Sequence, residues 1–356
     1  MNAHDRLLAA IRLQPTDRVP CAPHVSPAIA RAMPPAEWQA LLQHTDVTMS
    51  VGALGDTQIF GGQYLLDHTA RHRDGNTTRT EIETPQGLLR TRQVRTRDAS
   101  WVEERLVKDS HDVERLLSIP YSPPAFDVDA YWAWEAELGE QGFVALGMPS
   151  AFRFCLGVLG SQPLYTLIAD DVDLVERLVA TMNERLAVYV EACCDKGVRS
   201  FWMGGSEHCG PGVVHPRMLH RLITPYDTRI VEIIHQYGGV VNYHTHGKLH
   251  DILDEIAAIG VDVLSPIETG LRGDVTLAEV KARVGERICL KGNLDDMAFL
   301  ALAPADEVRS AAEECLAQAA KGGGYILSGT DAGIYRPEWV ASFLVMAEVA
   351  REVRYD

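Results

Sequence analysis

The pattern of hydrophobic and polar positions changes at about residue 143. From there to the end of the sequence, short apolar runs alternate with longer segments whose apolar residues recur at helical spacing. The apolar runs are FVALG, VRSFWMGG, GGVVNYHTH, VDVLSPIE, RICLKGN and GGYILSGTD. The longer segments are residues 174–196, 216–237, 248–259, 277–284, 305–320 and 337–353. This alternation predicts parallel strands that are joined by right-handed helical crossovers.

Six such units, together with an earlier strand, indicate an α/β fold in which residues 1–356 form one (β/α)8 TIM barrel. RVPCAPHV, residues 18–25, is the candidate for the first strand. The alternative architecture is an open doubly wound sheet, which would need a glycine-rich phosphate loop after its first strand. Neither GxGxxG nor GxxxxGK[ST] occurs in the sequence, so the barrel is favoured.

Residues from about 75 to 107 have a different pattern. TRTEIETPQGLLRTRQVRT alternates with a period of two residues around the turn sequence Thr-Pro-Gln-Gly at 84–87. Alternation on both sides of a turn is typical of two antiparallel strands. We therefore expect an N-terminal antiparallel β-hairpin, inserted before the regular barrel units.

Composition and charge narrow the classes of partner. The chain of 356 residues is 46% hydrophobic and carries 33 Lys and Arg against 49 Asp and Glu, a net charge of −16. This charge repels nucleic acid phosphates and anionic lipid headgroups, so we expect a small-molecule substrate, no nucleic acid and no membrane. With no signal peptide, no membrane-length apolar run and seven scattered cysteines, we expect a cytoplasmic, reduced protein. The sequence contains no recognisable pattern that determines the oligomeric state, so a homodimer stays open.

Polar residues follow five successive apolar runs, where a barrel places its reactive groups. His244 and His246 lie two residues apart, and on an extended chain their side chains project to one side. Two imidazoles can bind one ion, and Glu268 and Asp331 at other strand ends can add carboxylate oxygens. This set suits zinc, with iron and manganese as alternatives. The competing interpretation is two unrelated histidines in a polar loop.

Glu207 and His208 lie in the glycine-rich segment GGSEHCGPG. A glutamate beside a histidine at a strand end can act as a general acid/base pair or provide further ligands. The competing interpretation is a solvated Glu207 and a His208 that caps the helix starting near residue 216. Cys209 is a candidate nucleophile or soft ligand, or simply a small residue of the loop.

Four further residues are candidates for contact with the substrate: His24, Arg153, Tyr226 and Asn293. Arg153 lies between two phenylalanines and can hold an anionic group, although a surface arginine would have the same pattern. Tyr226 follows a Thr-Pro pair, and an aromatic residue in an amphipathic helix can equally belong to the core. His24 and Asn293 lie at or near the ends of predicted strands.

Several segments resemble the uroporphyrinogen decarboxylase superfamily, and within it the cobamide-dependent methyltransferases of the methylcobamide:coenzyme M type. RLLAAIRLQPTDRVP resembles the superfamily's opening, and ETPQGLL resembles the early hairpin of the methyltransferases. PYDTRIVEIIHQYGG before HTHG resembles the segment leading into a metal-binding strand. LKGNLDD and LSGTDAGIYRPEWV resemble the family's GN(I/L)D strand end and its last strand and helix. The resemblance covers nearly the whole chain in order, and it implies a (β/α)8 barrel.

The resemblance also implies a metal site, with departures in its ligands. The zinc methyltransferases carry His-x-Cys and a later cysteine; here His244 matches the histidine and His246 replaces the first cysteine. Asp331 falls at or near the second cysteine, and Glu268 falls where related enzymes place a glutamate ligand. Replacing two thiolates by imidazole and carboxylate leaves a harder, more Lewis-acidic ion. The decarboxylases' arginine-rich stretch has no counterpart in CAPHVSPAIARAMPP.

The first functional hypothesis is a zinc-dependent, methyltransferase-like enzyme. It would move a methyl group between a corrinoid, or a methoxylated or methylated small molecule, and an acceptor held at the metal, with a corrinoid protein as a further partner. The second is a metal-free carboxy-lyase of the uroporphyrinogen decarboxylase type, whose polar groups stabilise developing charge. The third is a non-catalytic tetrapyrrole- or corrinoid-binding protein. The metal content of the protein separates the first hypothesis from the other two.

Overall fold

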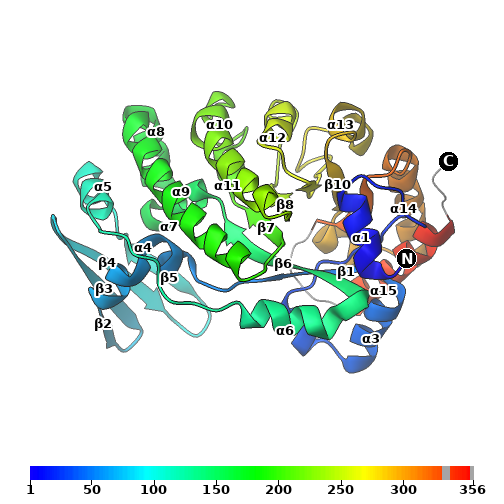
Figure 1. The fold of residues 1–356 in the computed structure, drawn as a ribbon, viewed down its shortest axis with the longest axis horizontal. Helices are drawn as coiled ribbons and strands as arrows, with labels where there is room; N and C mark the ends of the chain where they lie inside the picture. The colour runs from blue at the N-terminus through cyan, green and yellow to red at the C-terminus, as the bar shows by residue number, and fades with distance from the viewer. Residues whose placement is uncertain (331–336, 353–356) are drawn as a thin grey trace.

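The computed structural model describes residues 1–330 and 337–352, without the side chains of residues 56, 57 and 337. Its centre is a seven-stranded parallel sheet in the order β1-β6-β7-β8-β9-β10-β11 (Figure 1). The strands are β1 (Val47–Val51), β6 (Gly142–Pro149), β7 (Ser200–Gly204), β8 (Val240–His244), β9 (Val263–Ser265), β10 (Cys289–Leu294) and β11 (Tyr325–Gly329). Most of their residues are buried, as in a parallel sheet that is covered on both faces.

The extended segment 20–25 lies between the two edge strands of this sheet. It pairs with β11 through a parallel bridge between Cys21 and Leu327, and with β1 through a parallel bridge between His24 and Thr48. The segment predicted as the first strand therefore links both edges of the curled sheet. The result is a TIM-barrel-like α/β fold, in which the carboxyl ends of the strands meet at one mouth.

Helices form the outer layer. Before the sheet's second strand the helices are α1 (Ala3–Ile11), α2 (Pro27–Ala32), α3 (Pro35–His44), α4 (Asp56–Asp67), α5 (Ser110–Leu117) and α6 (Asp129–Leu138). After it they are α7 (Ala151–Leu159), α8 (Ser161–Asp170), α9 (Val172–Asp195), α10 (Arg217–Leu222), α11 (Thr224–Gln236), α12 (Leu253–Ile259), α13 (Leu277–Val284), α14 (Ala305–Ala319) and α15 (Pro337–Glu352). The series α9, α11, α12, α13, α14, α15 and α3 packs each helix on the next. Short helical turns lie at Gly139–Gln141, Ser206–Cys209 and Asp296–Leu300.

Two of the predicted helices differ from the structure. The segment 216–237 is divided into α10 and α11, because Pro225 in the first turn of α11 cannot continue a preceding helix. The segment 248–259 is helical only from Leu253, since the amides of Leu249 and His250 instead donate hydrogen bonds to the carboxylate of Asp274. The other four helices lie within two residues of their predicted bounds.

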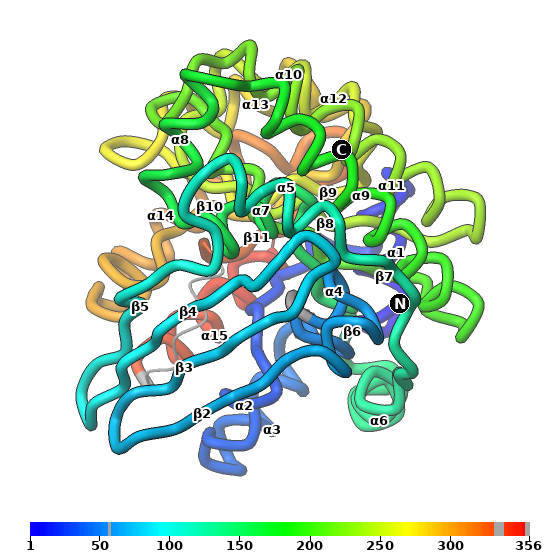
Figure 2. The backbone as a smooth tube through the Cα atoms, turned by 90° about the vertical axis from the view of Figure 1, so that its left-hand side faces the viewer, coloured from blue at the N-terminus to red at the C-terminus, as the bar shows by residue number. Residues whose placement is uncertain are grey.

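The residues around the predicted hairpin form a four-stranded antiparallel sheet rather than two strands. Its strands are β2 (Thr69–Asp74), β3 (Thr77–Thr84), β4 (Gly87–Arg95) and β5 (Ser100–Glu104), in that order. Strands β3 and β4 pair in register across the turn at residues 85 and 86. Ile82 and Leu89 are buried and belong to the main core, while β2 is largely exposed. Figure 2 shows this sheet beside the barrel.

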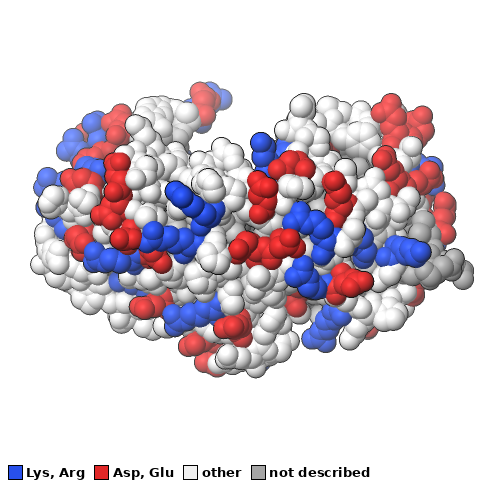
Figure 3. Space-filling model, turned by 90° about the horizontal axis from the view of Figure 1, so that it is seen from above, with Lys and Arg blue, Asp and Glu red and all other residues white. Residues whose placement is uncertain are grey.

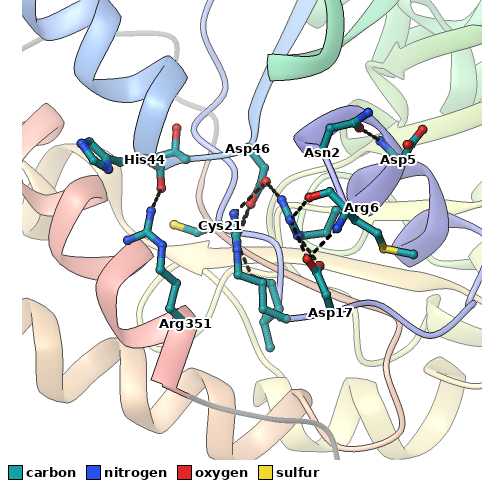
Figure 4. A network of polar contacts seen from close by, with 12 residues as sticks. Asn2, Asp5, Arg6, Asp17, Cys21, His44, Asp46 and Arg351 are labelled. Atoms are coloured by element: carbon teal, nitrogen blue, oxygen red, sulfur yellow. Dashed lines mark hydrogen bonds and ion pairs between the residues drawn. The ribbon is translucent and has the colours of Figure 1, made fainter.

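A buried charged cluster fastens the N-terminal segments to the sheet (Figure 4). Asp46 is fully buried and accepts hydrogen bonds from the guanidinium groups of Arg6 and Arg18, both at 2.7 Å. Its second oxygen also accepts the backbone N–H of Cys21 at 2.9 Å. Arg6 contacts Asp17 as well, and its hydrogen bond holds the pKa of that carboxyl well below the ordinary value. This cluster therefore ties α1 and segment 20–25 to the residue before β1.

Over the described ranges, 1–330 and 337–352, no helix combines the length and apolarity needed to cross a bilayer. All seven cysteines are buried and free. On the face drawn in Figure 3, basic and acidic side chains are interspersed.

Candidate active site

The mouth of the barrel contains a cavity of about 450 Å³ at the carboxyl ends of β6, β7 and β8. Its lining includes Arg153, Trp202, Gly205, Glu207, His244 and His246. A concave site of this volume, with a few convergent polar groups, is typical of a small-molecule site. The structure therefore brings together both predicted histidine ligands, the predicted acid/base residue Glu207, and Arg153, which is predicted to hold an anionic group.

The two histidines face each other. His244 is the last residue of β8, and its Nε2 lies 2.9 Å from the Nε2 of His246. His244 is buried, whereas the side chain of His246 is 37% exposed toward the mouth. The extended chain at the end of β8 thus places both imidazoles on one side, as the spacing predicts.

The second nitrogen of His244 lies near a hydroxyl from the neighbouring strand. The Oγ of Ser265, at the end of β9, lies 3.4 Å from Nδ1 of His244. That hydroxyl donates its own proton to Oδ1 of Asn242 at 2.8 Å. Its oxygen can therefore accept the Nδ1 proton of His244, which leaves Nε2 as a lone-pair donor.

Glu268 occupies the equivalent position beside His246. Its Oε1 lies 3.3 Å from Nδ1 of His246, and its Oε2 accepts the backbone N–H of Gly247 at 2.8 Å. Burial acts to raise the pKa of Glu268, but the hydrogen bonds of His246 and Gly247 outweigh it and the pKa is lowered. The ionised carboxylate thus favours a proton on Nδ1, which puts the lone pair of the His246 ring on Nε2.

This arrangement fits a divalent cation bound by two imidazoles. Two nitrogens bound tetrahedrally to zinc at 2.0–2.1 Å are roughly 3.3 Å apart. The two Nε2 atoms, which are 2.9 Å apart, therefore need to separate only slightly to bind the ion. In residues 1–330 and 337–352, no three His, Cys, Asp or Glu side chains are grouped as metal ligands. Asp331, the predicted carboxylate ligand, lies outside the described residues. Glu268 contacts Nδ1 of His246, the nitrogen that faces away from His244, and from this position it orients the ring.

Glu207 and His208 lie on the short turn that follows β7. The N–H of Gly205 donates to Oε2 of Glu207 at 3.0 Å, and Oε1 of Glu207 lies 3.4 Å from Nε2 of His208. Gly205 has a φ of +110°, and a Cβ there would lie 2.6 Å from the Cβ of Arg153, so only glycine fits. The helix beginning at Arg217 has no side-chain cap, so His208 does not cap it.

Cys209 does not have the environment of a nucleophile. Its side chain is fully buried in the core cluster. Burial raises the pKa of the Cys209 thiol, and the nearby Asp227 raises it further. The thiol therefore stays protonated near neutral pH, and a protonated thiol is a poor nucleophile and a poor metal ligand.

The four predicted substrate contacts are not all at the mouth. His24 lies 3.1 Å from the hydroxyl of Ser50 and stacks on Trp202, beneath the histidine pair. Tyr226 lies in the helix layer, where its hydroxyl is 3.5 Å from Glu176, and it does not line the mouth cavity.

Asn293 lies at the end of β10 and accepts a hydrogen bond from the thiol of Cys315. It lines a smaller cavity of about 200 Å³ together with Glu268 and Arg272. Arg153, on α7, is the one of the four candidates that lines the mouth cavity itself.

Two residues of the barrel interior were not identified from the sequence. The ring of Trp202 lies 4.6 Å from that of His244 and forms part of the mouth. Lys291 is almost fully buried beneath it, beside His24 and Asn242. The signal that could have found Lys291 is a charged residue inside the apolar run RICLKGN, which predicts a lysine that points into the barrel.

Comparison with known proteins places the chain in a family. The sequence model of the uroporphyrinogen decarboxylase (URO-D) family matches residues 126–350, well over half of the chain. The chain belongs to the uroporphyrinogen decarboxylase family. The matched region contains β6 to β11 and every predicted site residue except His24, and the predicted family is confirmed.

Curated members of the uroporphyrinogen decarboxylase family match only parts of the chain. The uroporphyrinogen decarboxylase of Vibrio cholerae is 32% identical over 117 residues, 32% of this chain and 30% of that protein. The uroporphyrinogen decarboxylase of Thioalkalivibrio sulfidiphilus is 28% identical over 189 residues, 50% of this chain and 49% of that protein. The chain thus spans half or less of the curated relatives it matches.

Among solved structures, a methyltransferase from Methanosarcina mazei is similar over the whole length. It covers 98% of both chains with a TM-score of 0.62 and 15% sequence identity. This similarity shows that the two proteins share a fold.

Proposed function

We propose that the protein is a zinc-dependent, methyltransferase-like enzyme with its active site at the barrel mouth. The observation that carries the proposal is the histidine pair, whose Nε2 atoms face each other while oxygens of Ser265 and Glu268 lie at the Nδ1 atoms. Family membership and the shared fold with a methyltransferase support it. Asp331 is proposed as a carboxylate ligand from the end of the last strand.

The chain's own residues supply binding and proton transfer in this proposal. A zinc ion between His244 and His246 would supply a Lewis acid for the heteroatom of a small acceptor. Glu207 lines the cavity and holds and moves the proton of that acceptor, together with His208, whose ring lies 3.4 Å from its carboxylate. Trp202 covers the side of His244 and keeps water from that ring.

The size of the mouth limits what enters it. A cavity of about 450 Å³ suits a small acceptor or a methoxylated or methylated small molecule. We propose that a corrinoid methyl donor reaches the mouth, which is open to solvent, while bound to a partner protein.

Metal content tests the proposal. Protein purified without added metal should contain roughly one zinc per chain, and His244→Ala and His246→Ala should remove it. His72→Ala, which changes an exposed histidine on β2, is the matched control and should keep the zinc. A metal-free wild-type protein that transfers methyl groups would contradict the proposal.

The carboxy-lyase and the non-catalytic binding protein are the two alternatives. The lyase is favoured by the curated relatives, but the segment after the first strand lacks an arginine cluster, and its Arg31 lies over the ring of Trp134. Decarboxylation of uroporphyrinogen by zinc-free protein would establish the lyase. Tight tetrapyrrole binding that Glu207→Gln leaves unchanged, without any turnover, would establish the binding protein.

A further inference from the structure

A second cavity, of about 430 Å³, lies between the antiparallel sheet and helix α7. Its walls include the apolar Phe60 of α4, Ile82 of β3 and Phe154 of α7, beside the polar Thr91 and Gln93 of β4. Arg153 lines both this cavity and the mouth cavity that contains the histidine pair. One side chain therefore borders both spaces, and a single elongated molecule could occupy them together.

Two guanidinium groups give this second cavity an uncompensated positive charge. Arg105 and Arg153 line it, and none of its lining residues is an aspartate or glutamate. Neither guanidinium forms a hydrogen bond or ion pair with another residue of the described chain. On the same sheet, Arg90 is instead paired with Glu81 at 2.8 Å. Two guanidinium groups that line one cavity, with no carboxylate in its lining, can bind an anionic ligand there.

The stems of both arginines pack closely against glycines. A Cβ on Gly205 would lie 2.6 Å from the Cβ of Arg153, and a Cβ on Gly160 would lie 2.5 Å from the Nε of Arg105. Both glycines also have positive φ values, +110° and +81°, which other residues rarely adopt. The backbone thus leaves space that these two arginines occupy, which restricts where their guanidinium groups can lie.

We propose that the second cavity binds the anionic, apolar arm of the substrate whose reacting end lies at the histidine pair. The ligand chemistry is a carboxylate or phosphate group on an apolar body: guanidinium groups bind either oxyanion through paired hydrogen bonds, and the apolar walls bury the body. The inference rests on the proposed function, because that function places the reacting end of the substrate in the mouth cavity.

Calorimetric titration of the metal-free protein with three probes tests the proposal. The probes are 4-phenylbutyrate, 4-phenylbutyl phosphate and the neutral 4-phenylbutan-1-ol. At least one anion should bind about ten-fold more tightly than the alcohol, because a hydrogen bond to a charged group is stronger than one to a neutral group. The tighter of the two anions identifies the headgroup. Equal binding of the alcohol, or no binding of either anion, would overturn the proposal.

Variants assign the site. Arg105→Gln and Arg153→Gln should each reduce the preference for the anion about ten-fold, while Arg79→Gln, an exposed arginine on β3, should leave it unchanged. Gly157→Phe should weaken all three probes about ten-fold, because Gly157 lines the cavity and its Cβ position is open except for Arg153 at 3.8 Å. Anion binding that stays unchanged in Arg105→Gln, Arg153→Gln and Gly157→Phe would refute the assignment.

The outcome is independent of the metal. The titrations use metal-free protein, so a chain that lacks zinc but binds the anion would refute only the proposed zinc function. A chain that holds zinc but shows no anion preference would refute only the second cavity.

Discussion

Two oxygen atoms determine which nitrogens of the histidine pair face the cavity. Ser265 lies at Nδ1 of His244, and Glu268 lies at Nδ1 of His246, so the lone pair of each ring lies on Nε2, the atom proposed to bind the cation. The spacing His-x-His predicts that both rings project to one side of the strand. It does not determine which nitrogen faces inward, since that depends on side chains that reach the pair from the end of β9.

Glu268→Gln should weaken zinc binding by about 10- to 100-fold without abolishing it. The glutamine keeps the length of the side chain but removes the charge that orients His246, and such outer contacts typically have this effect. Competition with a fluorescent zinc chelator measures the change. Glu255→Gln, which alters the partner of the exposed His220, is the control and should have no effect. Complete loss of zinc would instead make Glu268 a direct ligand.

Glu207→Gln should lower the turnover number for methyl transfer by roughly 10²- to 10⁴-fold, because the amide cannot accept a proton. Zinc content should not change, since Glu207 contacts Gly205 and His208 rather than the histidine pair. Transfer of a methyl group from methylcobalamin to a small thiol is a suitable assay. Exposed Glu137 on α6, changed to Gln, provides the control. Normal turnover in Glu207→Gln would exclude it as the proton carrier.

At the scale of elements, the pattern of apolar runs predicts most of the barrel because strands that are buried on both faces leave continuous apolar stretches. The sequence of β1, VTMSV, alternates between apolar and polar residues, and its burial alternates in the same way. Because it contains no continuous apolar run, the pattern of apolar runs does not predict this strand. The hairpin was expected to have two strands because β2 is almost entirely polar and exposed. The sequence leaves Tyr226 between a substrate contact and the helix layer, because its position depends on how α11 packs on α9, which local sequence does not encode.

A buried hydrogen bond between α11 and β8 predicts that the stability of the fold depends on pH. Asp227 of α11 is almost fully buried and accepts a hydrogen bond from Tyr243 of β8 at 2.7 Å. Burial raises its pKa to about 7, although the hydrogen bond from Tyr243 opposes this. The folded chain thus keeps a proton that the unfolded chain releases above about pH 4, so this group lowers stability as pH rises from 4 to 7.

Asp227→Asn should remove that contribution, because the amide stays neutral and its oxygen can still accept from Tyr243. The stability of the wild type relative to the variant should fall between pH 4 and pH 7, by at most about 4 kcal/mol. Urea unfolding of both proteins across this range measures the difference. A constant difference would show that Asp227 does not titrate in this window.

At the scale of the molecule, one carboxylate joins the parts that link the two edges of the sheet. Asp46, next to β1, contacts Arg6 of α1, Arg18 and the backbone of segment 20–25. These residues are far apart in sequence, so no local pattern predicts the cluster. The mouth depends on the same segment, because His24 lies on it and stacks on Trp202.

Asp46→Ala should lower the free energy of unfolding by roughly 3–5 kcal/mol, because it leaves the buried charge of Arg6 without this partner. Urea unfolding measures the loss. Asp98→Ala, in an exposed turn before β5, should change stability by less than about 0.5 kcal/mol. Similar values for the two variants would show that the cluster does not hold the fold together.

The central claim is that a single zinc ion binds between the Nε2 atoms of His244 and His246. X-ray absorption at the zinc edge of the zinc-loaded protein tests it most directly. We expect about two imidazole nitrogens at roughly 2.0–2.1 Å from the metal in the wild type, and no bound zinc in His246→Ala. A wild-type spectrum without imidazole ligands, or one that neither histidine change alters, would contradict the claim.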